Sequence, residues 1–133
     1  MSYYFSKTMD MSFDRAVAAI KEVLKRRGLR VLTEIDMRAN FKDALDVDFR
    51  PYLILGVCSP RLTYRALRAE DKIGTMLPSN IVLQQQEDGR IEISAVDPVA
   101  SMQAIPNVEI GQIAQDVRSL LQNVLDDIEA APC

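Results

Sequence analysis

The sequence predicts an α+β fold, a two-layer sandwich in which helices pack against one largely antiparallel sheet. Asp88-Gly89 is a favoured two-residue turn, and Ile91, Ile93 and Ala95 alternate with polar residues behind it, which is the pattern of a hairpin of antiparallel strands. Apolar residues at helical spacing run from Ile110 to Ile128, a stretch long enough to cover a sheet. The chain has 133 residues, 48% of them hydrophobic and 26% charged, which suffices for one domain with its own core.

The N-terminal region shows the patterns of a strand, a helix and a second strand. The first strand is expected over 3–7. Ser12 can then cap a helix whose apolar residues recur every three or four positions, and Gly28 ends this helix. Alternating apolar and polar residues over 29–35 predict a half-buried strand.

The middle of the chain contains the most informative junction. Residues 37–45 carry an apolar residue at every fourth position, which indicates a short helix or a helical loop. The run 52–58 is almost wholly apolar, as in an interior strand, and it ends at Cys58. Ser59 is a favourable N-cap and Pro60 a favourable first residue for the helix that follows. The sequence therefore places one thiol where a strand meets the start of a helix.

The C-terminal half begins with the hairpin and ends in a long helix. The two strands of the hairpin are expected over 80–87 and 90–96, joined by a two-residue turn at Asp88-Gly89. A loop then leads to Asn107, which can cap the last helix.

Composition argues against several classes of function. The net charge is -3 and the basic residues are spread along the chain, so no nucleic-acid partner is expected. The chain has no histidine, which removes the usual general base and the commonest metal ligand together. It also lacks a CxxC pair, a calcium-loop spacing of acids and a glycine-rich phosphate-binding loop. We therefore expect neither a metal site nor a cofactor.

The expected location is the cytoplasm. The N-terminal residues lack the pattern of a secretory signal, and no apolar run approaches the ~20 residues of a membrane helix. Cys58 and Cys133 are then expected to stay reduced. A single domain is expected over 1–129, followed by a flexible tail over 130–133.

Several separated motifs resemble a known family. They are Leu55-Gly-Val-Cys58-Ser-Pro60, Ile73-Gly74, Leu77-Pro78-Ser-Asn80 and Asp97-Pro98, in this order and together with the Asp88-Gly89 hairpin. In this combination the chain resembles family 302 of the domains of unknown function along nearly its whole length. The resemblance implies a compact α+β domain that pairs as a homodimer and has no established enzymatic role.

The chain departs from the pattern of that family near the thiol. Family members commonly carry a second cysteine where this chain has Ser79, and often asparagine in place of Ser59 and histidine in place of Tyr64. A mechanism that needs two cysteines therefore lacks its second thiol in this chain. The resemblance leaves a single-thiol or thiol-free role.

Cys58 is the first candidate site residue, and two interpretations are open. Backbone amides near Pro60 and Arg61 can stabilise a thiolate at the helix start, with Arg61 as further electrostatic support. Alternatively, Cys58 is a small buried hydrophobe that ends a core strand, and Ser59 is only a cap. The second interpretation describes the usual behaviour of an unpaired cysteine.

The remaining candidates are residues that the chain brings near this thiol or that carry a carboxylate. Pro78 and Ser79 are expected to border a small apolar pocket together with Cys58. Asp97 is either a catalytic carboxylate or, more simply, the residue that ends a strand by bonding its own backbone before Pro98.

Three functions are consistent with these patterns. The first is a cytosolic binding or interaction module without enzymatic activity, homodimeric, whose small apolar pocket near Cys58 takes a small molecule or contacts a protein partner. The alternative is a single-thiol redox or sulfur-carrier protein in which Cys58 holds a persulfide or a mixed disulfide. A third is a hydrolase or isomerase acting through Asp97, Tyr52 or Tyr64, which without histidine needs a metal or a carboxylate of shifted pKa.

Overall fold

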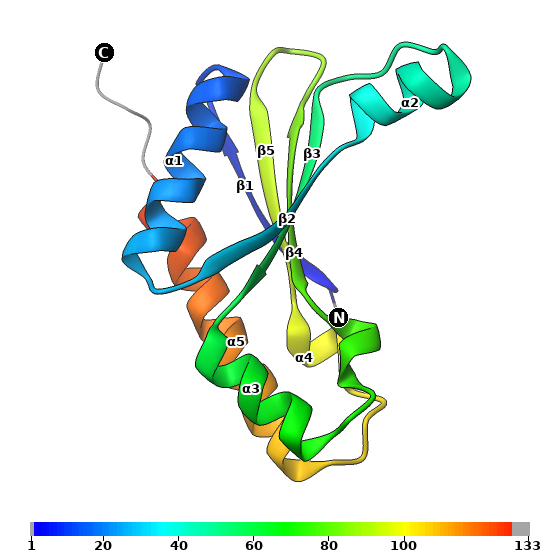
Figure 1. Cartoon of the computed structure of the whole chain (residues 1–133). Coiled ribbons are helices and arrows are strands. Elements are labelled where there is room, and N and C mark those ends of the chain that lie inside the picture. The colour runs from blue at the N-terminus through cyan, green and yellow to red at the C-terminus, as the bar shows by residue number, and fades with distance from the viewer. Residues whose placement is uncertain (1, 129–133) are drawn as a thin grey trace.

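Five antiparallel strands form one sheet in the computed structural model, which describes residues 2–128. The strands are β1 (Tyr4–Met9), β2 (Arg30–Asp36), β3 (Tyr52–Cys58), β4 (Ser79–Gln85) and β5 (Ile91–Val96). The helices are α1 (Phe13–Arg26), α2 (Met37–Leu45), α3 (Pro60–Ala69), the 3-10 turn η1 (Ile73–Met76), α4 (Pro98–Ser101) and α5 (Val108–Asp127). The strand order is β1-β5-β4-β3-β2, and α1 and α5 cover one face of the sheet (Figure 1). This arrangement confirms the predicted α+β fold.

The two covering helices begin where the sequence places their caps. The Ser12 hydroxyl accepts a hydrogen bond from the Arg15 amide at 3.2 Å, which satisfies one of the unpaired donors at the start of α1. The Asn107 side chain does the same for α5, because its Oδ1 accepts from the amides of Glu109 and Ile110 at 3.0 and 3.3 Å. Gly28 follows α1 with a φ of 75°, a conformation that glycine adopts without steric cost.

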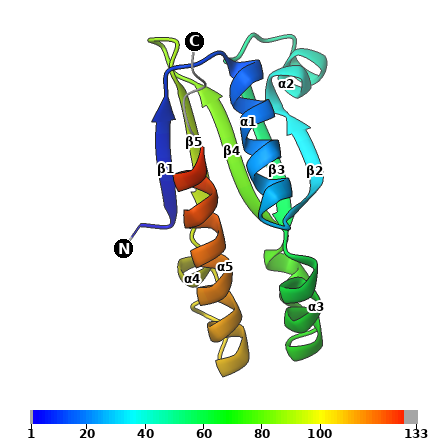
Figure 2. The same ribbon diagram turned by 90° about the vertical axis from the view of Figure 1, so that its left-hand side faces the viewer.

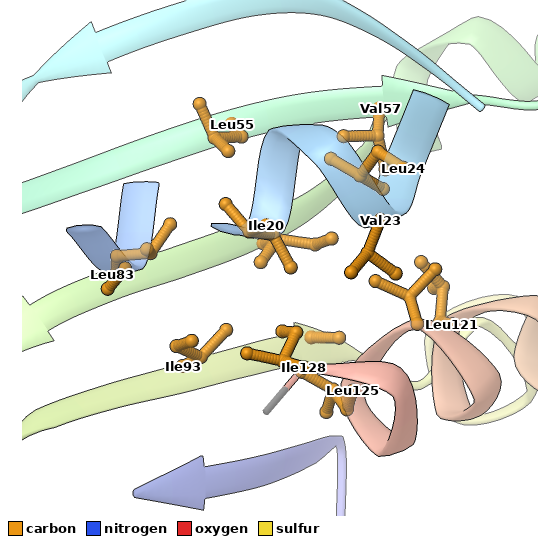
Figure 3. Packing of buried hydrophobic residues seen from close by; sticks show 14 of the residues in the cluster. Ile20, Val23, Leu24, Leu55, Val57, Leu83, Ile93, Leu121, Leu125 and Ile128 are labelled. Carbon is orange, nitrogen blue, oxygen red and sulfur yellow. The ribbon is translucent and has the colours of Figure 1, made fainter. Parts of the chain in front are cut away.

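The main core lies between the sheet and these two helices. Inward side chains of β3, β4 and β5 meet apolar side chains of α1 and α5 (Figure 3). The labelled members in Figure 3 are Ile20, Val23, Leu24, Leu55, Val57, Leu83, Ile93, Leu121, Leu125 and Ile128. Burial of such side chains is the dominant stabilising contribution to the fold.

A second hydrophobic cluster extends the molecule beyond one end of the sheet. Helix α3 and the N-terminal part of α5 run side by side past this end (Figure 2). The cluster consists of Leu62, Ala66, Ile73, Met102, Ile110, Ile113 and Ala114. No strand contributes to it among the residues that the structure describes. The molecule therefore has a sheet-based core and a helical extension that meet near the end of β3.

The strand expected over 29–35 is present as β2, but the expectation that its alternate side chains are buried is wrong. Leu29 is buried, but Leu32 and Ile35 are 56% and 41% exposed. A bulge shifts the register of β2 between Val31, which pairs with Val57, and Thr33, which pairs with Gly56. One extra residue reverses the alternation of a strand, so Thr33 and Ile35 lie on the face of the sheet opposite α1 and α5.

The hairpin turn and the loop after it also differ from the expectation. Five residues, 86–90, separate β4 from β5. The Gln86 amide donates to the Arg90 carbonyl at 2.8 Å and the Gly89 amide donates to the Gln86 carbonyl at 2.9 Å, so the turn between Gln86 and Arg90 has three residues rather than two. A two-residue turn of the type expected needs positive φ at both positions, and here Gly89 has a φ of 87° while Asp88 does not. The loop expected after Val96 contains the short helix α4, whose N-cap is Asp97.

Helix α2 stands apart from both hydrophobic clusters. None of its residues is buried. Figure 1 shows it beyond the other end of the sheet, on the side away from α1 and α5. No helix within residues 2–128 is long and apolar enough to cross a lipid bilayer. The tail expected over 130–133 lies outside the described residues.

Candidate functional site

A small apolar cavity lies where the main core meets the helical extension. Its volume is about 20 Å³, which is room for roughly one water-sized group. Residues of β3, α3 and α5 line most of it, among them Val57, Leu62, Ala66, Ala114 and Leu121. Cys58, Ser59, Thr63 and Ser79 are the lining residues that bear a thiol or hydroxyl group.

The thiol is positioned by a strand that ends directly before a helix. Cys58 is the last residue of β3 and is half-buried. The Ser59 hydroxyl accepts a hydrogen bond from the Leu62 amide at 3.4 Å, and Pro60 is the first residue of α3, so both act as the sequence predicts. The chain therefore turns sharply at Ser59, and Cys58 remains at the wall of the cavity.

The strand next to β3 also contributes to the lining near the thiol. Ser79 is the first residue of β4, pairs with Val57 across the sheet, and is only 7% exposed. Both Cys58 and Ser79 thus line the cavity, although 21 positions separate them in the sequence. The structure brings these two predicted site residues together.

Pro78 contributes through its contact with the backbone of β3. A Cβ atom at Gly56 would lie 2.6 Å from the Pro78 Cγ and would also collide with the Thr33 hydroxyl. Only glycine leaves room for this close approach of the loop to the strand. Pro78 does not line the cavity beside Cys58, but it borders a shallower hollow with Thr75 and Ser101.

Asp97 lies away from the cavity in an environment of its own. It is 5% exposed, and its Oδ1 accepts a hydrogen bond from the Val99 amide at 3.0 Å. Its Oδ2 is 3.4 Å from the Arg118 Nε, an ion pair whose geometry falls short of a hydrogen bond. The Arg118 guanidinium also stacks over the Phe5 ring at 5.5 Å. Asp97 therefore caps α4 and links β5 to α5.

The groups named for a hydrolase or isomerase are dispersed. Tyr52 lies at the start of β3, Cys58 at its end, and Tyr64 is exposed on α3. Asp97 is engaged with α4 and Arg118. Arg61, which was named as electrostatic support for the Cys58 thiolate, is exposed and does not line the cavity. These positions offer no pair of acid and base facing one another.

The chemistry available at the cavity is correspondingly limited. Within the described chain, Cys58 is the single ionisable side chain in the lining. Residues 2–128 contain no group of three or more acids or cysteines placed to hold a metal. The cavity can receive a small apolar group, and its thiol can bond to an incoming sulfur atom.

Sequence reasoning missed the helical wall of the cavity. Ile110, Ile113, Ala114, Val117 and Leu121 all come from α5, and their periodicity predicts a buried face without saying what they border. Arg118 was also missed, although a signal existed. It is the only basic residue within α5, and an isolated arginine on a helix that packs against a sheet indicates a specific acidic partner.

Comparison with known proteins agrees with this fold. The model of the family "Domain of unknown function DUF302" matches residues 5–128. The crystal structure of an uncharacterised conserved DUF302 protein from Bacillus stearothermophilus superimposes with a TM-score of 0.89 at 23% sequence identity, covering 97% of this chain and 100% of that one. No curated protein matches the chain. Because the family model spans nearly the whole sequence, the protein belongs to the family of domains of unknown function DUF302.

Proposed function

We propose that this protein is a cytoplasmic binding module that works as a homodimer and takes a small apolar group into the cavity beside Cys58. The observation that carries the proposal is the position of the cavity. It lies at the junction of two hydrophobic clusters, and apolar side chains form most of its lining. Apolar cavities of about 150 Å³ accept guests such as benzene or xenon. This cavity has about 20 Å³, so such a guest requires it to enlarge.

The junction also supplies a way for the cavity to enlarge. Helix α3 buries only Leu62 and Ala66, and it packs against α5 rather than against the sheet. The backbone between Cys58 and Pro60 has the extended conformation of an N-cap, outside the helical hydrogen-bond pattern. A small movement of α3 about Ser59 therefore separates it from α5 without breaking a strand pair, and a larger guest then fits.

The binding proposal is tested by filling the cavity. Ala114 lines it and is buried, so Ala114→Leu occupies the space that a guest needs. Ala18 is exposed on α1, so Ala18→Leu is the matched control. We expect xenon or benzene to shift backbone amide resonances around Cys58 in the wild type and in Ala18→Leu, and to leave Ala114→Leu unchanged. Equal shifts in all three proteins, or none in the wild type, would contradict the proposal.

The homodimer is tested separately by sedimentation equilibrium. Proteins with exposed apolar surfaces of several hundred Å² commonly bury them against a partner, and this chain exposes large apolar residues on several elements. We expect a mass twice that of the chain at micromolar concentration. If the protein has the mass of a monomer at all concentrations up to about 100 μM, the homodimer is removed from the proposal.

A second function, a single-thiol sulfur carrier, is favoured by the half-buried thiol at the start of α3. In the transfer step the Cys58 thiolate attacks the terminal sulfur of a donor persulfide. A new S–S bond forms on Cys58, the S–S bond of the donor breaks, and the donor leaves as its thiolate. Reversal of the step on an acceptor thiolate passes the sulfur on, so no external oxidant is needed.

The carrier is tested by sulfur loading on a Cys133→Ser background, which leaves Cys58 as the sole cysteine. We expect incubation with a low-molecular-weight persulfide to add one sulfur atom, seen by mass spectrometry, and Cys58→Ser to abolish the addition. Alkylation of Cys58 in the folded state at the rate of the unfolded chain would show an accessible thiol. Alkylation only on unfolding would rule out the carrier and leave the binding module in place.

A further inference from the structure

Within residues 2–128, no helix covers the face of the sheet opposite α1 and α5 (Figure 1). Because β3, β4 and β5 pair in register, the residues that alternate with the core positions all point to this face. They are Tyr52, Ile54 and Gly56 from β3, Asn80, Val82 and Gln84 from β4, and Glu92, Ser94 and Val96 from β5. We call this set the open face. A shallow hollow of about 340 Å³ lies over it, bordered by Tyr3 and Tyr4 near one end and Tyr52 near the other.

The composition of the open face is that of an interface rather than of a solvated surface. Eight of its nine residues are uncharged, and Glu92 is the exception. The carboxylate of Glu92 is linked to a cation, because Arg50 donates to Gln84 at 2.9 Å and Gln84 donates to Glu92 at 3.4 Å. Depletion of charge at the centre and enrichment in tyrosine are the marks of protein interfaces.

The apolar surface continues from the sheet onto α2. The Phe49 ring lies 6.1 Å from the Tyr52 ring, and the Phe41 ring of α2 lies 5.1 Å from Phe49. Leu45 at the end of α2 is 65% exposed. In Figure 1, α2 stands on the same side of the sheet as the open face. An amphipathic helix that buries none of its residues needs a second surface to cover its apolar side.

The size of this surface matches the requirement of a dimer. The edge strands β1 and β2 continue the uncovered face of the sheet on either side of the open face. All five strands together, about 4.8 Å apart and each with about six residues at 3.3 Å, present roughly 480 Å². Helix α2 adds on the order of 100 Å². Two copies that cover each other in this way bury about 1,200 Å² in total, which is the lower end of the range for specific, stable interfaces. A single small ligand would leave most of the surface exposed.

We infer that the open face and α2 bind the same surface of a second copy of this chain. The inference rests on the proposed homodimer and names its surface. A two-fold axis brings the same patch from both copies together, so one self-complementary face is sufficient. The two sheets then pack about 10 Å apart with their helices on the outside, and α2 of each copy contacts the partner beyond the end of its sheet.

The edge strand β2 favours this face-to-face packing over extension of the sheet. Its bulge between Val31 and Thr33 disturbs the row of free backbone groups. Arg30 and Glu34 place charges on the same strand. Bulges and charges at a sheet edge are devices that prevent a second chain from adding there.

The test places a charge at the centre of the open face. Val82→Glu introduces a carboxylate there, and Val108→Glu is the matched control, because Val108 is 94% exposed at the start of α5 and a helix tolerates an acid in its first turn. Ser94→Glu is the second variant, since Ser94 pairs with Val82 and a partly exposed serine tolerates replacement in the monomer. Circular dichroism is used to check that each variant is folded before its mass is measured.

Sedimentation equilibrium then distinguishes the outcomes. We expect the wild type and Val108→Glu to be dimers, and Val82→Glu and Ser94→Glu to raise the dimer dissociation constant by at least about 100-fold, because each dimer would bury two uncompensated carboxylates. If folded Val82→Glu and Ser94→Glu remain dimers, the open face is not the interface, although the homodimer stands. If the wild type itself is a monomer, both the homodimer and its surface are wrong.

Discussion

At the scale of single residues, Gly56 shows how one missing side chain lets distant segments meet. The Pro78 ring and the Thr33 hydroxyl both occupy the space that a Cβ would need. Thr33 comes from β2, and Pro78 leads into β4, so the glycine sits where three segments converge. Two residues further along β3 is Cys58, and the cavity wall depends on this convergence.

Gly56→Ala is therefore expected to destabilise the protein. The added methyl group forces Pro78 or the backbone of β3 to shift, and overpacking of this kind costs about 1–3 kcal/mol. The measurement is the free energy of unfolding from urea denaturation. Gly111→Ala is the control, because a Cβ at Gly111 meets no atom within 4 Å and alanine favours its helix by up to about 1 kcal/mol. Equal stability of the two variants would mean that the contact at Gly56 relaxes freely.

Asp88 gives a pH-dependent prediction in the hairpin loop. Its carboxylate accepts from the Arg90 amide at 3.0 Å and from the Arg90 Nε at 2.8 Å. These hydrogen bonds, the one to the backbone first, hold the pKa of Asp88 below the 3.8 that is ordinary for aspartate. A folded-state pKa below the unfolded one stabilises the fold above the unfolded pKa, and this stabilisation disappears as the pH falls through the folded pKa.

We therefore expect Asp88→Asn to unfold at a lower temperature than the wild type near pH 7 and at the same temperature near about pH 2. Thermal unfolding followed by circular dichroism at the two pH values gives the comparison. Asp10→Asn, in the exposed loop after β1, is the control and should show no such difference. A Tm difference for Asp88→Asn that is the same at both pH values would exclude the carboxylate charge as its cause.

At the scale of elements, β1 and α5 are joined by a contact between the two ends of the chain. The Lys7 Nζ donates to the carbonyls of Leu125 and Ile128 at 3.1 and 2.6 Å. The last carbonyls of a helix have no partners within the helix and form its negative end, so an ammonium group is favourable there. Lys7 pairs with Ile93, whose side chain lies in the core, so this lysine points inward from an edge strand.

Lys7→Met tests this contact while keeping the length of the side chain. We expect a loss of about 1–2 kcal/mol, because the variant leaves two carbonyls without a charged donor. Lys21→Met is the control, since Lys21 pairs with Glu34 at 2.8 Å in an exposed ion pair, and such pairs contribute less than about 1 kcal/mol. Chemical denaturation compares the two. A loss for Lys7→Met no larger than that for Lys21→Met would show that water replaces the ammonium group.

At the scale of the whole molecule, two hydrophobic clusters share one helix. The C-terminal half of α5 belongs to the main core, and its N-terminal half belongs to the helical extension. The extension lacks a sheet within the described residues, so fewer backbone hydrogen bonds tie it to the rest of the protein. Regions of this kind open locally at a lower free energy than the core does.

Hydrogen exchange should therefore separate the two parts. We expect the amides of α3 to exchange at least about tenfold faster than those of α1, which packs on the sheet. The measurement is hydrogen–deuterium exchange followed by mass spectrometry. Loss of protection in α3 and α1 at the same rate would indicate a single cooperative unit, without the local opening by which we expect the cavity to enlarge.

The local structure of this protein follows from its sequence. The caps Ser12, Ser59 and Asn107 begin α1, α3 and α5 as predicted, because each side chain bonds to backbone amides only two or three residues away. The apolar stripe of α5 and the hairpin of β4 and β5 are also local patterns, and together they predict the fold class, although the turn of the hairpin differs from the one expected.

Tertiary structure decided what depends on contacts between distant residues. The bulge that exposes Ile35 depends on the pairing of β2 with β3, and no sequence pattern within β2 predicts it. Sequence reasoning placed Cys58 and Ser79 at a pocket, but the helical wall from α5 and the separation of Asp97 from that pocket emerged only from the packing. The open face has the same origin, because a strand pattern shows which residues share a face but not whether a helix covers it.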